Sequence, residues 1–393
     1  ALAAADATAL AAGTKTPQQL IVALPELASA DEAERLPATA HLAAVLSNLQ
    51  SANTALPQAA ADHILTFLTS RLHDYPCSAP VLGGLCSLIT ATHELDAALV
   101  QTLTFTLLEE VDVRSLVQAE RQAALALTLA LAQKRWAALA PSGVRMLLSA
   151  LRAFDAEKDP RNLIGFLRLL RELTLRCADA PPAALDVALA EIFDALAHYF
   201  PIEFSPPPGD PHGVTQPHIV QAYIRALKAS AKFAPRVLPW LLDKLADDDQ
   251  PGAILQALQA LALLAPAYGA AAVAPHAQRL SLGLARRVTK LAGIAPDSPL
   301  TAAVGECARA VACAAAGDAQ LQIVAAPVDA ALAEPPASAG ADRAASVLRA
   351  LLRTPAAPFV VERTLAAMPS RVADGGRPHA VRSDGLALLL ALL

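Results

Sequence analysis

Aromatic and charged side chains are scarce in this chain of 393 residues. Phe, Trp and Tyr make up 4% of it, and Asp, Glu, Lys and Arg make up 17%, against about a quarter charged in an ordinary domain. The shortage of aromatic and β-branched residues excludes an all-β fold, because strands prefer these residues. Intrinsic disorder over most of the length is excluded too, because disordered chains are polar and highly charged, whereas 55% of these residues are hydrophobic.

Cysteine is also rare, and its five positions are far apart: Cys77, Cys86, Cys177, Cys307 and Cys313. An odd number without C-x-x-C spacing predicts reduced thiols in a cytosolic or nuclear protein, packed as small hydrophobic side chains. An iron–sulfur cluster needs four thiolates at close spacing. The sequence therefore predicts no cofactor and no metal site built on cysteine.

Motifs of catalysis are missing as well. The sequence contains no G-x-S-x-G, G-x-x-x-x-G-K-[ST], G-x-G-x-x-G or H-E-x-x-H, and its nine histidines are dispersed. His212 and His218 lie six apart with Asp210 nearby, but a metal would need two further converging ligands. A capping or surface role explains these histidines more simply. Of the function classes considered, an enzyme is the least supported.

The charge balance and hydropathy limit the partners. The 31 basic and 36 acidic residues leave a net charge of −5 and a pI near 6.0, which argues against direct binding of nucleic acid, because phosphate contacts require a basic surface. A mean hydropathy of +0.41 invites a membrane interpretation. The longest uncharged stretch, residues 250–278, is broken by glutamines and prolines, so we expect no membrane-spanning helix.

Alanine and leucine, the strongest helix formers, dominate what is present. Apolar residues recur at helical spacing in segments separated by Pro, Gly, Asp and Ser, with helix starts about 20 residues apart. Residues 235–266 show one unit clearly: a helix containing Pro239, an acidic turn, and a second helix with Gln256 where many HEAT units place an arginine. Pairs of about forty residues are typical of HEAT or armadillo repeats. We therefore predict an all-α HEAT/ARM-like α-solenoid of antiparallel helix pairs, wound as a right-handed superhelix.

Two Asp-Pro pairs predict helix starts, with Asp159 and Asp210 as N-caps. The second pair lies in the proline-rich segment 200–217, where Pro206, Pro207 and Pro208 favour a polyproline II conformation. Three interpretations of this segment stay open. The segment could serve as a rigid spacer between repeats, as a loop that docks a partner, or as a metal site at His212.

Basic residues recur on one helical stripe in each of two segments, 161–168 and 279–290. Arg168 precedes Glu172 by four residues, a spacing at which helix side chains pair. A solvated outer face is the simpler interpretation, and contact with an acidic partner is the functional one. With the proline-rich segment, these residues form the predicted partner surface: Arg161, Arg168, Pro206, Pro207, Pro208, His212, Arg279, Arg286 and Lys290.

Two segments carry a specific likeness to a known family. Residues 157–163 read EKDPRNL, and residues 199–213 read YFPIEFSPPPGDPHG. Together they resemble the N-terminal region of the Mms-nineteen family of large HEAT-repeat proteins. Weaker likeness extends through VDVRSLVQAERQ (111–122) and RLHDYPCSAPVLGGL (71–85). The resemblance assigns residues 1–290 to that domain, most clearly 60–290. We expect residues 291–393 to continue the helical repeats, and we interpret the chain as a fragment that ends within the array.

The resemblance implies a function that composition and spacing do not. Mms-nineteen proteins are non-enzymatic adaptors of the cytosolic iron–sulfur assembly targeting complex, active in the cytoplasm and the nucleus. They present cluster-free clients, such as DNA-repair helicases and polymerases, for cluster insertion, and so support nucleotide excision repair and transcription. Other subunits of the complex are expected to bind repeats C-terminal to this chain. The alternative is a nuclear-transport or general scaffold HEAT protein, which leaves the two motifs unexplained.

Overall fold

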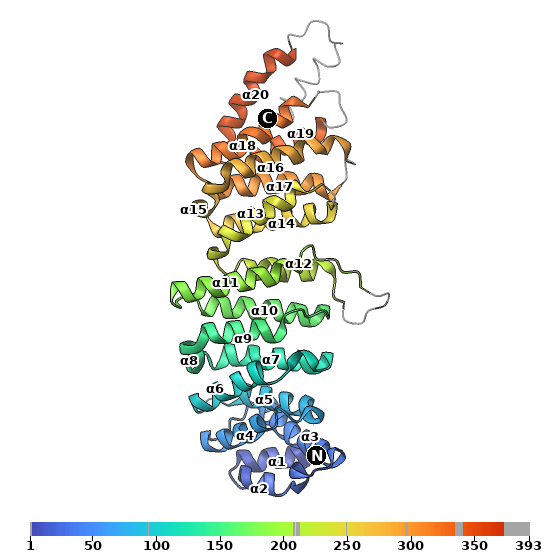
Figure 1. The fold of residues 1–393 in the computed structure, drawn as a ribbon, viewed down its shortest axis with the longest axis vertical. Coiled ribbons are helices and arrows are strands. Elements are labelled where there is room, and N and C mark those ends of the chain that lie inside the picture. Colours follow the sequence, from blue (N-terminus) through green and yellow to red (C-terminus); the bar gives the residue numbers. More distant parts are fainter. Residues whose placement is uncertain are drawn as a thin grey trace. The chain divides into compact units, whose positions relative to one another are not determined.

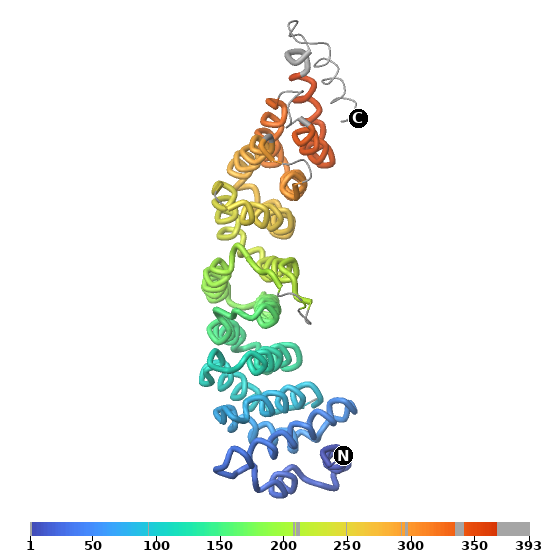
Figure 2. The backbone as a smooth tube through the Cα atoms, turned by 90° about the vertical axis from the view of Figure 1, so that its right-hand side faces the viewer, coloured from blue at the N-terminus to red at the C-terminus, as the bar shows by residue number. Residues whose placement is uncertain are grey.

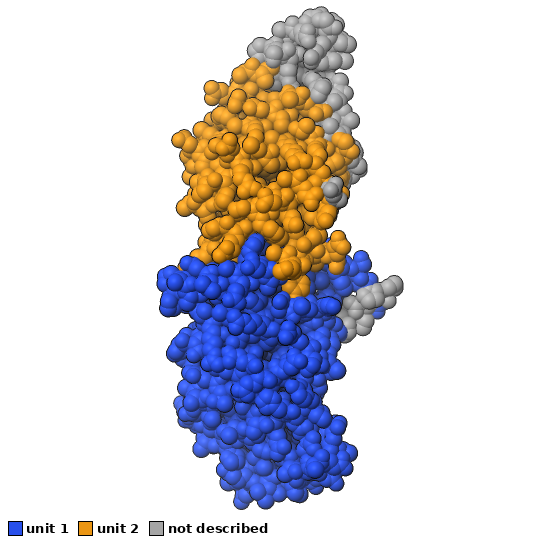
Figure 3. Space-filling model, in the orientation of Figure 1, with its two compact units in different colours: residues 1–195, 204–229 blue, residues 196–203, 230–393 orange. Residues whose placement is uncertain are grey.

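The computed structural model describes residues 2–92, 94–206, 209, 213–248, 250–294, 298–334 and 341–372. The regular secondary structure of these residues is helical, with no β-strand among them. They divide into two compact units (Figure 3), of which unit 1 comprises residues 1–195 and 204–229 and unit 2 comprises residues 196–203 and 230–393. The predicted all-α solenoid class is confirmed, since both units are stacks of helices.

Unit 1 is built from helices α1 to α12. Their bounds are α1 Leu2–Ala11, α2 Pro17–Val22, α3 Glu32–Ser51, α4 Gln58–Ser70, α5 Ser78–Ala91, α6 Ala97–Phe105, α7 Gln118–Lys134, α8 Trp136–Leu139, α9 Gly143–Phe154, α10 Pro160–Arg176, α11 Pro182–Ala197 (its last two residues belong to unit 2) and α12 Gln216–Leu227. Short turns of 3₁₀-helix lie at Pro25–Ala28, Tyr75–Cys77, Val113–Ser115 and Ala140–Ser142, and a π-helix covers Thr106–Glu110.

The helices of unit 1 stack in two layers (Figures 1 and 2). In the first layer α1, α3, α5, α7, α10 and α12 pack in succession. In the second layer α2, α4 and α6 follow one another, and α6 also contacts α8 and α9. Helices of the two layers meet within a repeat, as α4 meets α5 and α9 meets α10. Each pair therefore buries its apolar face on its neighbours, as repeat architectures require.

Unit 2, taken by itself, is also built from two layers of helices. Its helices are α13 Ala234–Ala246, α14 Pro251–Tyr268, α15 Ala270–Val273, α16 Ala277–Lys290, α17 Pro299–Ala314, α18 Gly317–Ala333, α19 Ala341–Leu351 and α20 Ala357–Val372, with 3₁₀ turns at Ala231–Phe233, Ala274–His276 and Leu291–Gly293. One layer contains α14, α17 and α19, and the other contains α13, α16, α18 and α20. Residue 290, the predicted end of the N-terminal domain, lies inside unit 2, where α16 packs on α18.

The sequence of α10 shows how a single helix of the array is specified. Asp159 caps it, with Oδ1 accepting the backbone N–H groups of Arg161 at 2.9 Å and Asn162 at 3.3 Å, and Pro160 takes the first turn. Its buried side chains recur every three or four residues: Leu163, Phe166, Leu167, Leu170 and Leu173. The apolar stripe therefore faces the core and the arginines face outward.

Ion pairs join neighbouring repeats at sequence spacings of 36 to 39 residues. Arg35 and Asp74 are 39 residues apart, and Arg121 and Glu157 are 36 apart. Arg145 with Glu109, Arg152 with Glu191, and Arg279 with Asp243 are separated by 36, 39 and 36 residues. This spacing agrees with the predicted helix pair of about forty residues, because each ion pair connects equivalent parts of adjacent pairs.

One described helix, α14, is long and apolar enough to cross a membrane by length and composition, contrary to the expectation that no stretch would be. Of its 18 residues, 56% are buried inside the unit, and core helices that pack on both sides meet the same criteria. Pro266 does not interrupt it, since the helix extends to Tyr268.

Candidate functional site

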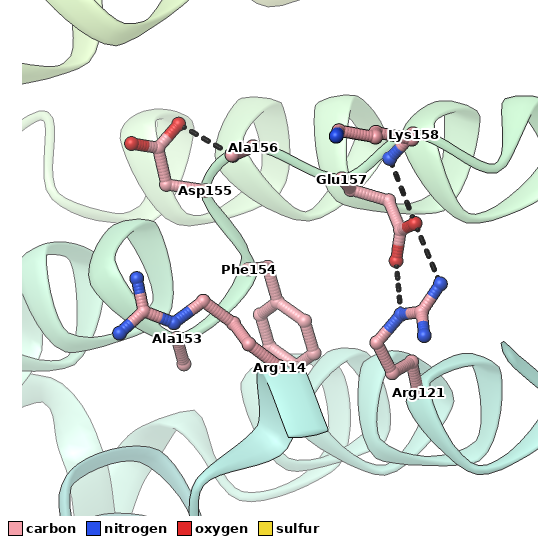
Figure 4. Close-up of a pocket in the computed structure, with 8 residues that line it drawn as sticks. All are labelled: Arg114, Arg121, Ala153, Phe154, Asp155, Ala156, Glu157 and Lys158. Atoms are coloured by element: carbon pink, nitrogen blue, oxygen red, sulfur yellow. Dashed lines mark hydrogen bonds and ion pairs between the residues drawn. The ribbon is translucent and has the colours of Figure 1, made fainter. Parts of the chain in front are cut away.

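The motif EKDPRNL forms a clasp between two helices of unit 1 (Figure 4). Glu157 precedes α10, and its carboxylate receives two hydrogen bonds from Arg121 on α7: Nε to Oε2 at 2.7 Å and Nη2 to Oε1 at 2.9 Å. The Glu157 side chain is 4% exposed. Its Oε1 also accepts the backbone N–H groups of Lys158 and Asp159, both at 2.9 Å. A buried carboxylate is thus fully paired, as burial of charge requires.

Asn162 extends the clasp along the same interface. Its Nδ2 donates to the backbone carbonyl of Gln118 at 3.1 Å and to Oε2 of Glu157 at 3.2 Å, and its Oδ1 accepts Nε2 of Gln118 at 3.1 Å. Arg121 also donates to the carbonyl of Leu116 at 2.8 Å. The motif therefore locks α7, the loop before α10 and α10 itself together, and its role in this structure is to hold successive repeats.

Two opposing effects act on the pKa of Glu157. Burial raises it, but the hydrogen bonds from Arg121, from the backbone N–H of Asp159 and from Asn162 outweigh burial and keep the pKa below its ordinary value. The carboxylate is consequently charged at neutral pH. It serves as a fixed ionic partner and not as a proton donor.

A shallow cavity of about 260 Å³ lies beside the clasp (Figure 4). Arg114, Phe154, Asp155 and Lys158 contribute to its lining, and the side chain of Arg114 extends away from the Arg121–Glu157 pair. Arg114 and Lys158 are exposed to solvent. The lining has no cysteine, serine or histidine that could act as a nucleophile or base.

The motif YFPIEFSPPPGDPHG begins with an anchored stretch in unit 2. Phe200 packs edge-on against Trp240 of α13 with ring centroids 4.8 Å apart, and the Phe200–Pro201 peptide is cis. Ile202 is held at its backbone by Gln256 of α14. The Gln256 Oε1 accepts the Ile202 N–H, and its Nε2 donates to the Ile202 carbonyl, both at 2.9 Å. Gln256 is buried, and its side-chain amide satisfies both the backbone donor and the backbone acceptor of Ile202.

Replacing Phe200 with alanine is expected to destabilise unit 2 by roughly 3–5 kcal/mol, since Phe200 is buried against Trp240. Leu263→Ala is the control, because Leu263 also lies in unit 2 but is 50% exposed, so its replacement should cost less. Chemical denaturation followed by Trp240 fluorescence in a Trp136→Phe background measures both. Equal destabilisation by the two variants would contradict the anchoring role of Phe200.

Most of the proline-rich candidates lie outside the described residues, namely Pro207, Pro208, Asp210 and His212. Pro206 is described and exposed. The predicted cap at Asp210 therefore stays a prediction, and the first described helix after this segment, α12, begins at Gln216 with Thr215 as its N-cap. Gly213, just before α12, has a φ of +62°, a left-handed conformation that glycine adopts readily. The backbone N–H of Thr215 is satisfied by Nδ1 of His218 at 3.3 Å.

The basic residues of α16 are paired within unit 2. Arg279 donates to Asp243 of α13 at 2.8 Å. Lys290, Arg287 and Arg286 all donate to the carboxylate of Asp248 and hold its pKa well below the usual range. The predicted partner residues Arg279, Arg286 and Lys290 therefore clamp α16 to the preceding repeat.

The two basic candidates of α10 differ from each other. Arg161 folds back on Asp159, with Nη2 to Oδ2 at 2.8 Å. The pairing of Arg168 with Glu172 is wrong, because Glu172 accepts Nε of Arg176 at 2.7 Å instead. Arg168 is exposed. Of the candidates on these two helices, it alone keeps a charge that the described side chains do not pair.

The sequence did not predict which residues the two motifs contact. Arg121 and Gln118 lie within the quoted stretch 111–122, but only packing shows that they meet Glu157 and Asn162. The sequence singled out Gln256 only because it stands where many HEAT units place an arginine. Its partner, the backbone of Ile202, is 54 residues away, so no local pattern could predict the contact.

Cysteines and acidic or histidine side chains form no group of three or more that could hold a metal ion in the described part of the chain. Cys77, Cys177 and Cys307 are buried, Cys86 is half-buried and Cys313 is exposed. Burial raises the pKa of Cys177 to about 11, and it raises the pKa of Cys307 further.

Alkylation by iodoacetamide at neutral pH is therefore expected to modify Cys313 first. Cys177 and Cys307 should react only after unfolding in denaturant, because both are shielded and protonated. Mass spectrometry of proteolytic peptides gives the order of modification. Reaction of Cys307 as fast as that of Cys313 would contradict the packing of α17.

One family profile matches most of the chain. It is the MMS19 N-terminal profile, described as Dos2-interacting transcription regulator of RNA-Pol-II, and it matches residues 23–290. The chain belongs to this family. Both the clasp motif and the motif anchored by Gln256 lie inside the matched range, and the resemblance to the Mms-nineteen family is confirmed.

Curated relatives in animals and plants agree with this assignment. A human protein named MMS19 nucleotide excision repair protein homolog is 31% identical over 208 residues, which are 53% of this chain and 20% of that protein. The protein of the same name in Xenopus laevis is 30% identical over 52% of this chain and 20% of its own length. The Arabidopsis thaliana protein of the same name is 25% identical over 54% of this chain and 19% of its own length. The chain thus spans about a fifth of the length of these MMS19 relatives.

Solved structures similar to this chain include nuclear-transport receptors. Importin beta aligns over 98% of this chain and 47% of its own at 12% identity and a TM-score of 0.42. Kap121p bound to Pho4p aligns over 96% and 41% at 13% identity and a TM-score of 0.48. At these identities the likeness concerns the fold alone.

Proposed function

We propose that this chain is part of a non-catalytic scaffold that supports nucleotide excision repair. The observation that carries the proposal is the family match over residues 23–290, together with relatives named MMS19 nucleotide excision repair protein homolog. The structure is compatible with it, because no catalytic chemistry is needed to explain either motif. Both motifs hold repeats together, and stacked repeats present extended surfaces to partners.

Within that role, the resemblance supports a finer proposal. The protein acts as an adaptor of the cytosolic iron–sulfur assembly targeting complex and presents apo clients, among them DNA-repair helicases and polymerases, for cluster insertion. Its place of action is then both the cytoplasm and the nucleus. The protein holds no cluster of its own in this proposal, and the scattered, mostly buried cysteines support that view.

Depletion of the protein in its own cells tests both levels. Iron loading of repair helicases should fall and removal of ultraviolet lesions should slow. Re-expression of the intact protein should restore both, whereas Arg121→Ala, which opens the clasp, should restore them poorly, and Arg152→Ala, which breaks an exposed pair, should restore them fully. Unchanged iron loading with slowed lesion removal would refute the adaptor role, and unchanged lesion removal would refute the repair role.

A further inference from the structure

The outer faces of α10 and α12 carry cations that no described acidic side chain neutralises. From Asp159 to Arg176 the chain has four arginines and two carboxylates, and both carboxylates are occupied, by Arg161 and Arg176. Residues 216–228 contain Arg225 and Lys228 and no carboxylate. The net charge of the whole chain is −5, so these two helices form a local region of positive charge on a negatively charged protein.

These cations lie on one continuous face. Arg168 and Arg171 are three residues apart on α10, as Arg225 and Lys228 are at the end of α12, and all four are exposed. Residues at this spacing share a helix face. In both helices that face is opposite to the buried stripe, and α10 and α12 are neighbours in the same layer (Figure 2). The four side chains, here called the basic face, therefore point to the same side of unit 1.

The basic face has a limited extent and an apolar component. On the neighbouring helix α7, the corresponding exposed residues are Ala119, Gln122 and Ala126, which are uncharged. Leu175 lies one turn beyond Arg171 on α10 and is 43% exposed. Clustered cations around an exposed leucine differ from a scattered solvated surface, in which charges of both signs alternate.

We infer that the basic face is a docking site for an acidic polypeptide segment, whose carboxylates pair with Arg168, Arg171, Arg225 and Lys228 and whose apolar side chain covers Leu175. Charge complementarity selects this occupant. A nucleic acid fits less well, because the net charge is −5, the pI is near 6.0, and phosphates would leave Leu175 uncovered. The inference rests on the proposed role as a scaffold that binds other proteins.

Fluorescence anisotropy with the full chain tests the inference. The probe is a short helical peptide with glutamates along one face and a leucine among them, compared with a peptide in which lysines replace the glutamates. The wild-type chain should bind the glutamate peptide saturably and the lysine peptide not at all. Arg168→Glu with Arg225→Glu should weaken glutamate-peptide binding roughly tenfold and create binding of the lysine peptide. Circular dichroism verifies that the variant is folded.

The matched control is Arg236→Glu with Arg353→Glu, which changes the net charge equally at two exposed positions of unit 2. It should leave peptide binding unchanged. Equal weakening by both variants, or no binding by the wild-type chain, would overturn the inference. Tighter binding of duplex DNA than of the glutamate peptide, with a steep salt dependence, would also overturn it. None of these results concerns iron loading or lesion removal, so the proposed function is tested separately.

Discussion

Replacing Arg121 with alanine is expected to lower the free energy of unfolding of unit 1 by roughly 3–5 kcal/mol, because it leaves the buried Glu157 carboxylate without its cation. The chain contains two tryptophans, Trp136 in unit 1 and Trp240 in unit 2. In a Trp240→Phe background, Trp136 fluorescence during chemical denaturation reports unit 1 alone. The same loss should not appear when Trp240 is the reporter.

Arg152→Ala is the control for this prediction. Arg152 also pairs one repeat away, with Glu191, but the two side chains are 67% and 41% exposed, so we expect a cost below about 1 kcal/mol. Arg121→Met combined with Glu157→Leu should recover part of the stability, since no unpaired charge is then buried. Equal costs for Arg121→Ala and Arg152→Ala would show that the clasp contributes no more than a surface pair.

The clasp also predicts how stability depends on pH. The pKa of Glu157 is lower in the folded chain than its ordinary value, so the unfolded chain binds a proton more readily. The contribution of Glu157 is therefore complete above its unfolded pKa of about 4.3 and is lost as the pH falls through the folded value. Glu157→Gln should be less stable than the wild type at neutral pH, and the difference should shrink on acidification.

Replacing Gln256 with alanine is the second change with a large expected effect. The buried amide satisfies both the N–H and the carbonyl of Ile202, and its loss leaves two backbone groups without these bonds. At about 1–3 kcal/mol for each group that loses its bond, we expect unit 2 to lose roughly 2–6 kcal/mol. Hydrogen exchange measured by mass spectrometry should show faster exchange in the peptide containing residues 200–204.

Gln259→Ala is the matched control, because Gln259 lies on the same helix and is exposed. It should alter neither the exchange of residues 200–204 nor the unfolding of unit 2. If Gln256→Ala left exchange at Ile202 unchanged, the amide clamp would not be what holds this segment. Gln256→Glu separates shape from hydrogen bonding, since a carboxylate accepts the N–H but cannot donate to the carbonyl.

Helix content and the repeat period could be derived from the sequence because both depend on local patterns. The recurrence of Ile64, Leu65 and Leu68 on one face predicts a buried stripe, and these residues are buried in α4. Asp159 and Pro160 likewise predict the start of α10 from two adjacent residues. The start of α12 at Gln216 was not predicted, because its N-cap, Thr215, has no side-chain hydrogen bond to the helix and is followed by proline only at residue 217.

Composition and local spacing by themselves determined an all-α array of paired helices, and the two motifs determined its family. Only the tertiary structure decided what those motifs do. Glu157 meets Arg121, 36 residues away in sequence, and Gln256 meets Ile202, 54 residues away, and the local sequence around each residue does not name its partner. The same holds for charge, since Arg286 is paired by Asp248 whereas Arg168 is left exposed. Which charges remain for a partner depends on the packing of successive repeats, and packing brings together residues that local sequence keeps apart.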